Sequence, residues 1–517
     1  MWFQHQRRRQ GDEYCCVFFA AVIHFLLNAG DITRIASFAN AQRRHNPLEN
    51  FSWQARDIKK NPPLFRGHKT NDNNATQKSL RYADKEPVDQ EDIPVASITV
   101  PLHSHSGTHH VYLHIGSPIP QRQTLILDTG SRYLAFPCRP YCQPNQCGRH
   151  ASHSYFDATL STTLRNNTPP NCVYSRSNKA NNNSNTCTFH LSYMEGSGWT
   201  AQEIEDLVWL GTEDIQESTE SYMPHLAVPF TFGCQTSIQG DLLLKQHADG
   251  ILGLAFAQRE HSFLNTMVRA NAIQRHAFST CMTRAGGTLS LGGSGTIVQP
   301  QEEEQRQQGR KETEDFNSFQ YHMEPMSFTR MAAENDAHSK SGYYTIPLNK
   351  ILLGDECITC SDSPDPKQNT KRQRAFDAFR AGKGVLLDSG STDTYFNKAS
   401  LPVFADIWTR MTGMKLVFQQ KYTYDQFRTI PDITFVFEPN ATLVVPASHY
   451  MEGVPMTSNG NMPEDVKPWT GYRRLFLRIY FDDPTGAVLG INAMYNYDIL
   501  YDLQGNRIGL ARSYCGS

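Results

Sequence analysis

Two short segments of the chain each place an aspartate after three apolar residues and before a turn of small residues. The first reads Leu-Ile-Leu-Asp-Thr-Gly-Ser around Asp128, and the second reads Val-Leu-Leu-Asp-Ser-Gly-Ser around Asp388. An apolar run can deliver each aspartate from a buried strand into a tight turn. Gly130 and Gly390 permit close backbone approach there, because glycine has no Cβ atom. The repeated pattern predicts two functional carboxylates, one from each half of the chain.

Ionising both of two neighbouring carboxyl groups is unfavourable, because their charges repel. The two groups therefore share one proton, and one acts as base while the other acts as acid. Such a pair can activate a water molecule and polarise an amide carbonyl without a covalent intermediate. Thr129 and Ser389 carry hydroxyls that can lock one turn against the other. Ser131 and Ser391 can hydrogen-bond to their own carboxylates and orient them. We therefore expect hydrolytic chemistry with no cofactor and no metal.

The elements that must position these turns are mostly strands. From Ser97 onward, short β-branched and aromatic runs such as SITVPL, HHVYLHIG and TLILDTG are interrupted by Gly and Pro. The 34 Gly and 28 Pro also suit a turn-rich β protein. Helical signals are few, and Lys398–Gly413 is the clearest. No period of 20–50 residues repeats, which argues against a solenoid. The pattern predicts a mainly β protein with short helices.

Length and charge limit the possible partners. The 517 residues allow two to four domains, or one two-lobed unit with appendages. The 49 Lys and Arg nearly balance the 51 Asp and Glu, for a net charge of −2. This balance gives no support to a nucleic-acid or membrane-surface role. Hydrophobic residues make up 39% of the chain, enough for a sizeable core.

The N-terminal residues resemble a targeting segment. Three arginines, Arg7 to Arg9, precede an apolar run at 14–29 and a small-residue exit at Ala29-Gly30. This order is typical of a signal peptide. An uncleaved anchor is the competing interpretation, because the residues before Ala29 make a poor cleavage site, and a buried helix is the third. We expect membrane attachment only if 14–29 remains as an anchor.

Cysteine usage agrees with export. Two of the twelve cysteines lie in the targeting segment, and the other ten could pair as up to five disulfides in an oxidising lumen. Spacing does not fix the pairing; a Cys357–Cys360 loop and a Cys281–Cys515 pair are guesses. Zinc is the weaker alternative, since matching ligand spacings are absent. Five glycosylation sequons are also compatible with a lumenal protein. The ten cysteines are Cys138, Cys142, Cys147, Cys172, Cys187, Cys234, Cys281, Cys357, Cys360 and Cys515, and the sequons begin at Asn50, Asn74, Asn166, Asn182 and Asn440.

Taken together, these motifs resemble the pepsin-like aspartic proteases over most of 96–517. The resemblance implies a bilobal fold with two β-barrel-like lobes, a substrate cleft between them and one catalytic aspartate from each. The apolar-apolar-Gly elements at 251–253 and 488–490 match strands that thread beneath the catalytic loops of that family. Tyr193, followed by Gly196, matches the tyrosine of the hairpin flap that covers the cleft.

The cysteine pattern resembles the nepenthesin-type insert, and most of all the plasmepsin V-type proteases of the parasite secretory pathway. Those enzymes cleave exported proteins at a site with Arg and then Leu two residues later. Their flap glutamate, which helps to hold the Arg, falls on Glu195. A carboxylate in a semi-closed cleft can select a guanidinium by a bidentate contact. The alternative is a solvated charge at the flap tip. Met194 departs from the pattern, since that subgroup has a cysteine there.

Composition shifts suggest how the chain is divided. Residues 31–81 carry ten Lys and Arg against four Asp and Glu, so a basic pro-segment could neutralise an acidic site until its removal. A basic linker is the equal alternative. Polar stretches at 165–186 and about 298–342 are expected to be surface loops. The expected parts are a signal segment 1–30, a leader 31–95, an N-terminal lobe 96–300, a polar insert 301–342 and a C-terminal lobe 343–517.

The leading functional hypothesis is an endopeptidase that processes secretory cargo in the endoplasmic reticulum or Golgi. The alternatives are a broad acid protease of a digestive vacuole or the cell exterior, and a non-catalytic peptide-binding relative. The last is disfavoured because both aspartate turns are intact. A metal-dependent hydrolase is also disfavoured, since no His-Glu-x-x-His occurs. The expected partners are protein or peptide substrates, the expected state is a monomer, and no nucleic acid is expected.

Overall fold

The computed structural model describes most of the chain from Ser97 to Gly516. The leader and targeting segments, Glu195 and the sequons at Asn50, Asn74 and Asn182 lie outside the described residues. All described residues belong to a single compact unit. The described ranges are 97–142, 144–148, 150, 155–175, 186–193, 196–211, 226–255, 261–295, 297–298, 321–331, 342–453 and 473–516.

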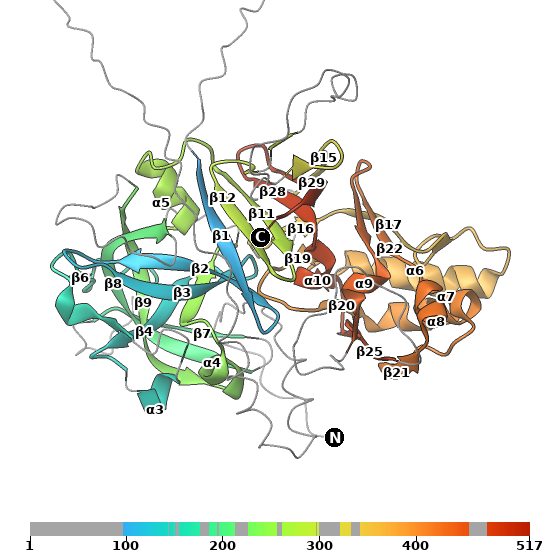
Figure 1. Cartoon of the computed structure of the whole chain (residues 1–517), viewed down its shortest axis with the longest axis horizontal. Helices are drawn as coiled ribbons and strands as arrows, with labels where there is room; N and C mark the ends of the chain where they lie inside the picture. Colours follow the sequence, from blue (N-terminus) through green and yellow to red (C-terminus); the bar gives the residue numbers. More distant parts are fainter. Residues whose placement is uncertain are drawn as a thin grey trace, which may run out of the picture. The chain divides into compact units, whose positions relative to one another are not determined.

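A sheet of 17 strands dominates the described residues (Figure 1). Every residue of β2 is buried, including its three histidines. Such burial is expected for strands covered from two sides. The strands are β1 (Ile98–His105), β2 (Thr108–Ile115), β3 (Gln121–Asp128), β4 (Leu134–Arg139), β5 (Phe156–Asp157), β6 (Arg165–Asn166), β7 (Thr188–Ser192), β8 (Gly198–Gly211), β9 (Val228–Gln239), β10 (Gly250–Gly253), β11 (Ala277–Thr283), β12 (Gly286–Leu291), β13 (Ile297–Val298), β14 (Tyr321–His322), β15 (Ser327–Arg330), β28 (Tyr497–Asp502) and β29 (Arg507–Tyr514).

The last two strands of the chain complete this sheet. β28 pairs antiparallel with β11, and β29 pairs with β28 (Figure 1). β14 and β15 then pair with β29. The interpretation of 298–342 as one surface loop is therefore wrong for β14 and β15, because β29 supplies their backbone partners. The division into lobes at 343 stays a prediction, although the large sheet takes strands from both sides of it.

Three smaller sheets follow in the second half, with strand orders β16-β19-β27-β20-β26, β18-β17-β22-β23 and β21-β25-β24. The prediction of a helix over Lys398–Gly413 is confirmed, since a 3₁₀ turn and α7 occupy this range and Gly413 ends α7 with φ of 66°. These strands are β16 (Thr345–Ile346), β17 (Leu348–Leu353), β18 (Glu356–Cys357), β19 (Val385–Leu387), β20 (Thr394–Asn397), β21 (Gln419–Tyr422), β22 (Ile433–Phe437), β23 (Thr442–Val445), β24 (Met451–Gly453), β25 (Arg473–Leu477), β26 (Ile479–Asp483) and β27 (Ala487–Leu489).

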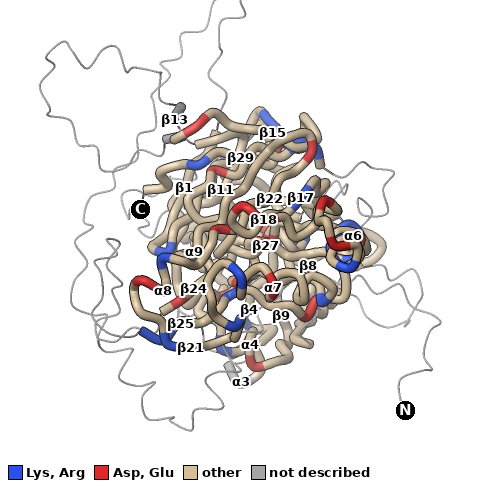
Figure 2. Tube along the Cα trace, turned by 90° about the vertical axis from the view of Figure 1, so that its right-hand side faces the viewer, with Lys and Arg blue, Asp and Glu red and all other residues tan. Residues whose placement is uncertain are grey.

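Helices are short apart from α6, which the sequence analysis did not predict. Asp365 caps its N-terminus through Lys367 N, and a proline occupies its first turn, two signals of a helix start. Ala375 and Phe379 are its buried residues, and basic and acidic positions are marked along its trace in Figure 2. The helices are α3 (Pro144–Cys147), α4 (Asp241–Lys245), α5 (Phe263–Arg269), α6 (Pro366–Arg380), α7 (Leu401–Thr412), α8 (Tyr424–Arg428), α9 (Ala447–Tyr450) and α10 (Ile491–Met494), with 3₁₀ turns η2 (Ala158–Leu160) and η4 (Lys398–Ser400).

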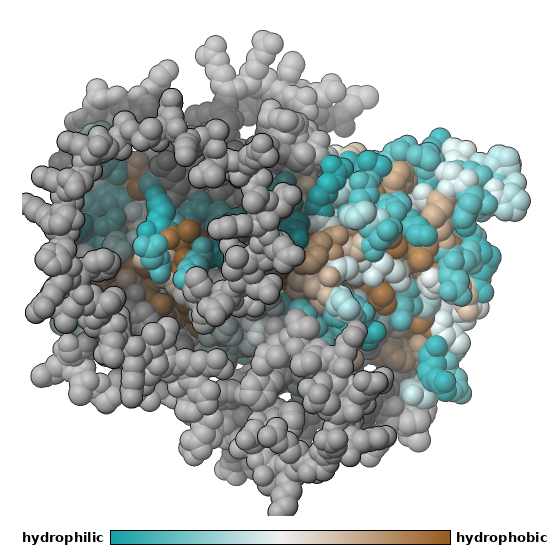
Figure 3. All heavy atoms as spheres, turned by 90° about the horizontal axis from the view of Figure 1, so that it is seen from above, coloured by the Kyte–Doolittle hydropathy of each residue, from teal (hydrophilic) through white to brown (hydrophobic). Residues whose placement is uncertain are grey.

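One large hydrophobic cluster joins both halves of the described chain. It includes Leu127 beside Asp128 and Leu387 beside Asp388, both fully buried. On the face shown in Figure 3, hydrophilic and hydrophobic described residues are interspersed. None of the described helices has both the length and the apolar character needed to cross a membrane.

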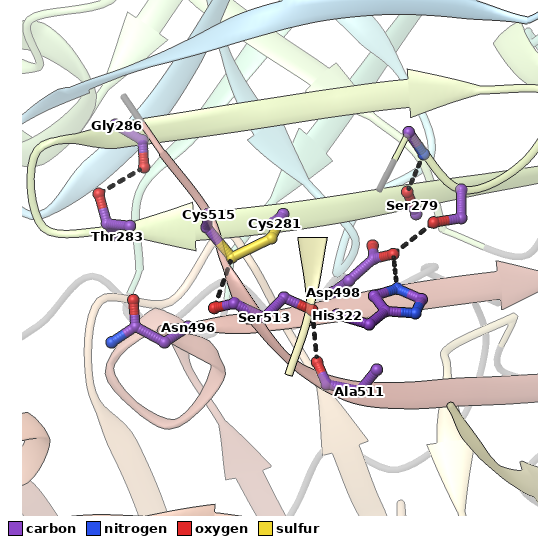
Figure 4. The surroundings of a disulfide bond; sticks show 12 residues. Ser279, Cys281, Thr283, Gly286, His322, Asn496, Asp498, Ala511, Ser513 and Cys515 are labelled. Carbon is purple, nitrogen blue, oxygen red and sulfur yellow. Dashed lines mark hydrogen bonds and ion pairs between the residues drawn. A yellow bond between two sulfur atoms is a disulfide. The ribbon is translucent and has the colours of Figure 1, made fainter. Parts of the chain in front are cut away.

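All ten body cysteines form disulfides, as expected for an oxidising lumen. The two guessed pairs, Cys281–Cys515 and Cys357–Cys360, are confirmed. Beside the first pair, His322 of β14 contacts Asp498 of β28 at 2.9 Å (Figure 4). The cysteines considered for zinc are instead bonded to other cysteines. The remaining pairs are Cys138–Cys234, Cys142–Cys147 and Cys172–Cys187.

Candidate active site

The two aspartate turns sit at the ends of matching parallel strand pairs. β3 ends at Asp128 and runs parallel to β10, with Gly253 opposite Asp128. β19 ends one residue before Asp388 and runs parallel to β27 in the same way. The main-chain N–H of Asp388 donates to Leu489 O at 3.0 Å. The predicted placement of 251–253 and 488–490 beside the two turns is therefore confirmed.

The two turns are locked together by their hydroxyl residues. Ser389 Oγ accepts from Thr129 N at 3.1 Å, and Thr129 Oγ1 accepts from Ser389 N at 2.9 Å. Each hydroxyl also donates across to the strand that delivers the other aspartate. Thr129 Oγ1 donates to Leu387 O, and Ser389 Oγ donates to Leu127 O. All four bonds are buried, so they hold the two halves of the site in one register.

Both carboxyl groups are fully buried and are oriented by their own turns. Gly130 N donates to Asp128 Oδ1 at 2.8 Å, and Gly390 N donates to Asp388 Oδ1 at 2.9 Å. Ser391 Oγ also donates to Asp388 Oδ2 at 2.8 Å. The matching bond from Ser131 is not made with standard geometry. Within the described residues, Ser131 Oγ and Asp128 Oδ2 make no hydrogen bond of standard geometry, but Ser131 still lowers the pKa of Asp128.

The carboxyl groups lie close enough to hydrogen-bond to each other, since this contact affects the pKa of both. A side chain at Gly390 would collide with Asp128 Oδ1 and would come within 3.2 Å of Asp388 Oδ1. The second turn therefore needs glycine for its close approach to the first carboxylate. This approach is what the sequence pattern predicts.

Burial and mutual repulsion separate the proton affinities of the pair. Burial, and next the charge of Asp388, hold the pKa of Asp128 well above its ordinary value. Burial also raises the pKa of Asp388 to about 6, against the opposing effects of its bonds from Ser391 and Gly390. A raised pKa in both groups is what two carboxyl groups that share one proton require. One group is ready to donate a proton and the other to accept one.

Tyr193 lies at the end of β7, where the chain turns into β8. Its main-chain N–H donates to Ser197 O at 2.8 Å, and its hydroxyl accepts from Trp199 Nε1 at 3.1 Å. Gly196 adopts φ of 96°, which favours glycine in this turn. The hairpin predicted as a flap is therefore present. Glu195, its predicted recognition residue, lies outside the described residues.

Sequence reasoning missed several buried residues that support the site. Trp199 was not singled out, although an aromatic residue in the strand after a hairpin turn is a recognisable signal. Tyr344 donates from its hydroxyl to Leu254 O at 2.6 Å, directly beyond the first threading strand. Thr392 Oγ1 donates to Gly107 O at 2.9 Å and so ties the second turn to the β1–β2 hairpin. The contacts of Tyr344 and Thr392 join distant segments, so no local spacing could reveal them.

Within the described ranges, no three His, Cys, Asp or Glu residues converge as a metal site would require. A proton donor and a proton acceptor held side by side can act together on one water molecule and one carbonyl group.

Comparisons with known proteins each match about a third of the chain. A family model described as "Xylanase inhibitor N-terminal" matches residues 109–293. Aspartic protease 5 of Toxoplasma gondii is 31% identical over 194 residues, which are 35% of this chain and 19% of that protein. Plasmepsin V of Plasmodium falciparum is 30% identical over 186 residues, 35% of this chain and 28% of that protein. Chymosin of Camelus dromedarius is 27% identical over 186 residues, 35% of this chain and 39% of that protein. The chain thus spans less than two thirds of the length of each of these relatives.

Proposed function

We propose that the chain is an aspartic endopeptidase of the pepsin-like family. The observation that carries the proposal is the pair of buried carboxyl groups within hydrogen-bonding reach of each other. They come from two matching turns cross-linked by Thr129 and Ser389. A non-catalytic peptide-binding relative would not need these features together.

In the proposed mechanism, Asp388 and Asp128 have different starting roles. The ionised Asp388 takes a proton from a water molecule, whose oxygen forms a bond to the peptide carbonyl carbon. Asp128 gives its proton to the carbonyl oxygen, so no full negative charge develops there. The C–N bond then breaks as Asp388 returns its proton to the leaving nitrogen, and Asp128 recovers a proton from the hydroxyl. The dyad ends the cycle with one proton, as it began.

The proposed setting is the lumen of the secretory pathway, where the protease would process exported cargo. The five disulfides support an oxidising compartment. Two relatives carry the names Aspartic protease 5 and Plasmepsin V. We further propose a preference for a site that contains Arg, with Glu195 as its recognition residue. A broad acid protease of a vacuole or the exterior is the alternative, and it predicts cleavage with general apolar preference.

The test is digestion of a proteome-derived peptide library by the purified protein, with Asp128→Asn and Asp388→Asn compared in parallel. Each substitution should lower turnover at least about a hundredfold, because each removes one partner of the proton transfer. Asp377→Asn is the matched control, since this exposed residue of α6 only accepts a hydrogen bond from Gln373. It should cleave like the unaltered protein.

Circular dichroism of each variant would establish that the fold is kept. Full turnover by either pure dyad variant would refute the proposed mechanism. A strict requirement for Arg among the cleaved sites would support the processing role, whereas broad apolar cleavage would favour the digestive one.

A further inference from the structure

Four histidines from three segments of the chain lie together at the β1–β2 hairpin. His103 and His110 are cross-strand partners, and their ring centres are 5.6 Å apart. The ring of His247, in the segment after α4, stacks on that of His105 at 3.5 Å and lies 5.7 Å from that of His110. Together they form the histidine cluster, which the proposed dyad mechanism does not use.

The histidine cluster connects two parts of the candidate active site. At the tip of the hairpin, Gly107 O accepts from Thr392 Oγ1, and a Cβ atom on Gly107 would lie 2.6 Å from Thr392 Cγ2. The hairpin is therefore in close contact with the second aspartate turn. The segment that carries His247 begins at Gly240, where a Cβ atom would lie 2.6 Å from Ser197 Cβ in the β7–β8 turn. The cluster thus joins the support of the second turn to the base of the β7–β8 hairpin.

The cluster is poorly suited to hold protons. A charged imidazole donates from both ring nitrogens, yet Nδ1 of His110 is buried and makes no hydrogen bond with the described residues. Burial, and next the charges of His103 and His247, lower the pKa of His110 to about 3. Burial also lowers the pKa of His105. At neutral pH these two rings are therefore uncharged, and they can pack against their neighbours.

Acid would place like charges together without a compensating carboxylate. The pKa of His110 responds to four other histidines, the three of the cluster and His109 of the same strand. β12, which pairs with β1, carries no charged residue, while β3 and the β11–β12 turn bring the cations Arg122 and Arg284. The described carboxylates on the adjoining elements already have partners elsewhere. They are Asp128 with Gly130, Asp388 with Ser391, Asp393 with Arg478, Asp249 with Thr124, and Asp241 with Lys245.

We propose that the histidine cluster is an acid-sensitive switch, which releases the β1–β2 hairpin from the segment of His247 when its surroundings become acidic. Protonation of two or more rings places like charges within stacking distance, so the contact between the rings is lost. The hairpin tip then no longer supports Thr392, and the second aspartate turn loses its register. This regulation rests on the proposed protease function, and it restricts that function to a compartment near neutral pH.

Acid should therefore destabilise the folded protein through this cluster. The pKa of His110 is about 3 in the folded chain, whereas about 6.5 is expected in the unfolded chain. Its contribution to stability is complete above that higher pH and is lost as the pH falls towards the lower one. A histidine held neutral raises the unfolding constant about tenfold for each pH unit below 6.5, which gives about thirtyfold at pH 5.

Urea unfolding of the full chain at pH 7.5 and pH 5 tests the switch without any substrate. The measured quantity is the ratio of the unfolding constants at the two pH values. His110→Gln cannot be protonated, so it should reduce this ratio about thirtyfold relative to the unaltered protein. His105→Gln combined with His247→Gln removes the half-buried stacked pair. This second variant should also reduce the ratio, and it decides the matter if His110→Gln does not fold.

His261→Gln is the matched control, because His261 is an exposed histidine outside the cluster. It should leave the ratio unchanged. In a second arm, kcat/KM for one cleaved peptide is measured at pH 5.5 and pH 7. The dyad contributes equally in every variant, so a histidine variant should keep a several-fold larger fraction of its activity at pH 5.5 than the unaltered protein.

Equal ratios of the unfolding constants in the unaltered protein and the cluster variants would overturn the switch, as would an equal change in His261→Gln. A change in unfolding without any change in the pH dependence of kcat/KM would overturn its regulatory role. Failure to cleave any peptide would refute the protease function itself, whereas the unfolding measurements would still decide whether the cluster responds to acid.

Discussion

The Asp388 carboxyl accepts from both Gly390 N–H and Ser391 Oγ, whereas the Asp128 carboxyl accepts from Gly130 N–H alone by standard geometry. Ser131 also lowers the pKa of Asp128, so the two turns differ mainly in the charges around them. The charge of Asp388 raises the pKa of Asp128, whereas Lys383 lowers that of Asp388.

In a plot of kcat/KM against pH, the fall on the acidic side (the acid limb) should follow the protonation of Asp388. The pKa of Asp388 is raised to about 6, mainly by burial. Below that pH both carboxyls are protonated, no base remains, and kcat/KM should fall about tenfold per pH unit. Ser391→Ala removes a donor that favours the ionised form, so the limb should move to higher pH and the rate at pH 5 should drop roughly tenfold further.

Ser513→Ala is the control for that measurement, because Ser513 is also buried but donates to Ala511 O far from the dyad. If the acid limb of Ser391→Ala lies at the same pH as that of the unaltered protein, the role assigned to this hydroxyl is contradicted. A limb that moves equally in both serine variants would point to a general loss of packing.

At the scale of elements, β8 anchors the loop that precedes the β7–β8 hairpin. Glu203 is buried in the middle of this strand and accepts from the main-chain N–H groups of Val173 at 2.6 Å and Tyr174 at 2.9 Å, and from that of Ser175. The Cys172–Cys187 bond closes the same loop. One carboxylate thus satisfies three donors of a segment that has no strand partner of its own.

Glu203→Gln should destabilise the protein by about 1–3 kcal/mol, because the amide NH₂ cannot accept and leaves a buried N–H group without its partner. Glu205→Gln is the control. It lies two residues along the same strand and contacts Arg165 at 3.6 Å near the surface, where such pairs contribute at most about 1 kcal/mol. Urea unfolding of both variants gives the comparison. Equal stability of the two would rule out the anchoring role of Glu203.

Sequence patterns predicted the features that depend on neighbouring residues and missed those that depend on residues far apart in the chain. Short and distinctive residue patterns predicted the two aspartate turns, the strands beside them, the hairpin at Tyr193 and α7. α6 was missed although its Asp-Pro start is a standard signal. β14 and β15 were read as loop, because their strand character depends on β29, which is far along the chain. Arg478 likewise contacts Asp393 at 2.7 Å and Glu452 at 3.2 Å only after three separate segments pack together.

At the scale of the whole molecule, the disulfides differ greatly in the length of chain they close. Cys281–Cys515 links residues separated by 234 positions, whereas Cys357–Cys360 spans a separation of 3. A cross-link stabilises mainly by restricting the unfolded chain, and more so for longer loops. The long bond also joins β11 to the segment after β29, within the large sheet that both halves share.

Replacing Cys281 and Cys515 together by alanine should therefore cost more stability than replacing Cys357 and Cys360. The chain-entropy relation gives about 5 kcal/mol for the long loop and about 2 kcal/mol for the short one. Denaturant unfolding of the two double variants measures the difference. A larger loss from the short loop would show that local strain or packing outweighs the constraint on the unfolded chain.

The pairing of β28 with β11 has a consequence for how the protein is made. Because translation proceeds from the N-terminus, β11 leaves the ribosome long before its partner exists. Until about 220 further residues have been added, roughly ten to forty seconds at ordinary elongation rates, the nascent chain carries an open sheet edge that other chains can join. A chaperone that shields this edge during synthesis would protect the yield of the protein, and a polypeptide truncated before Tyr497 would remain exposed to aggregation.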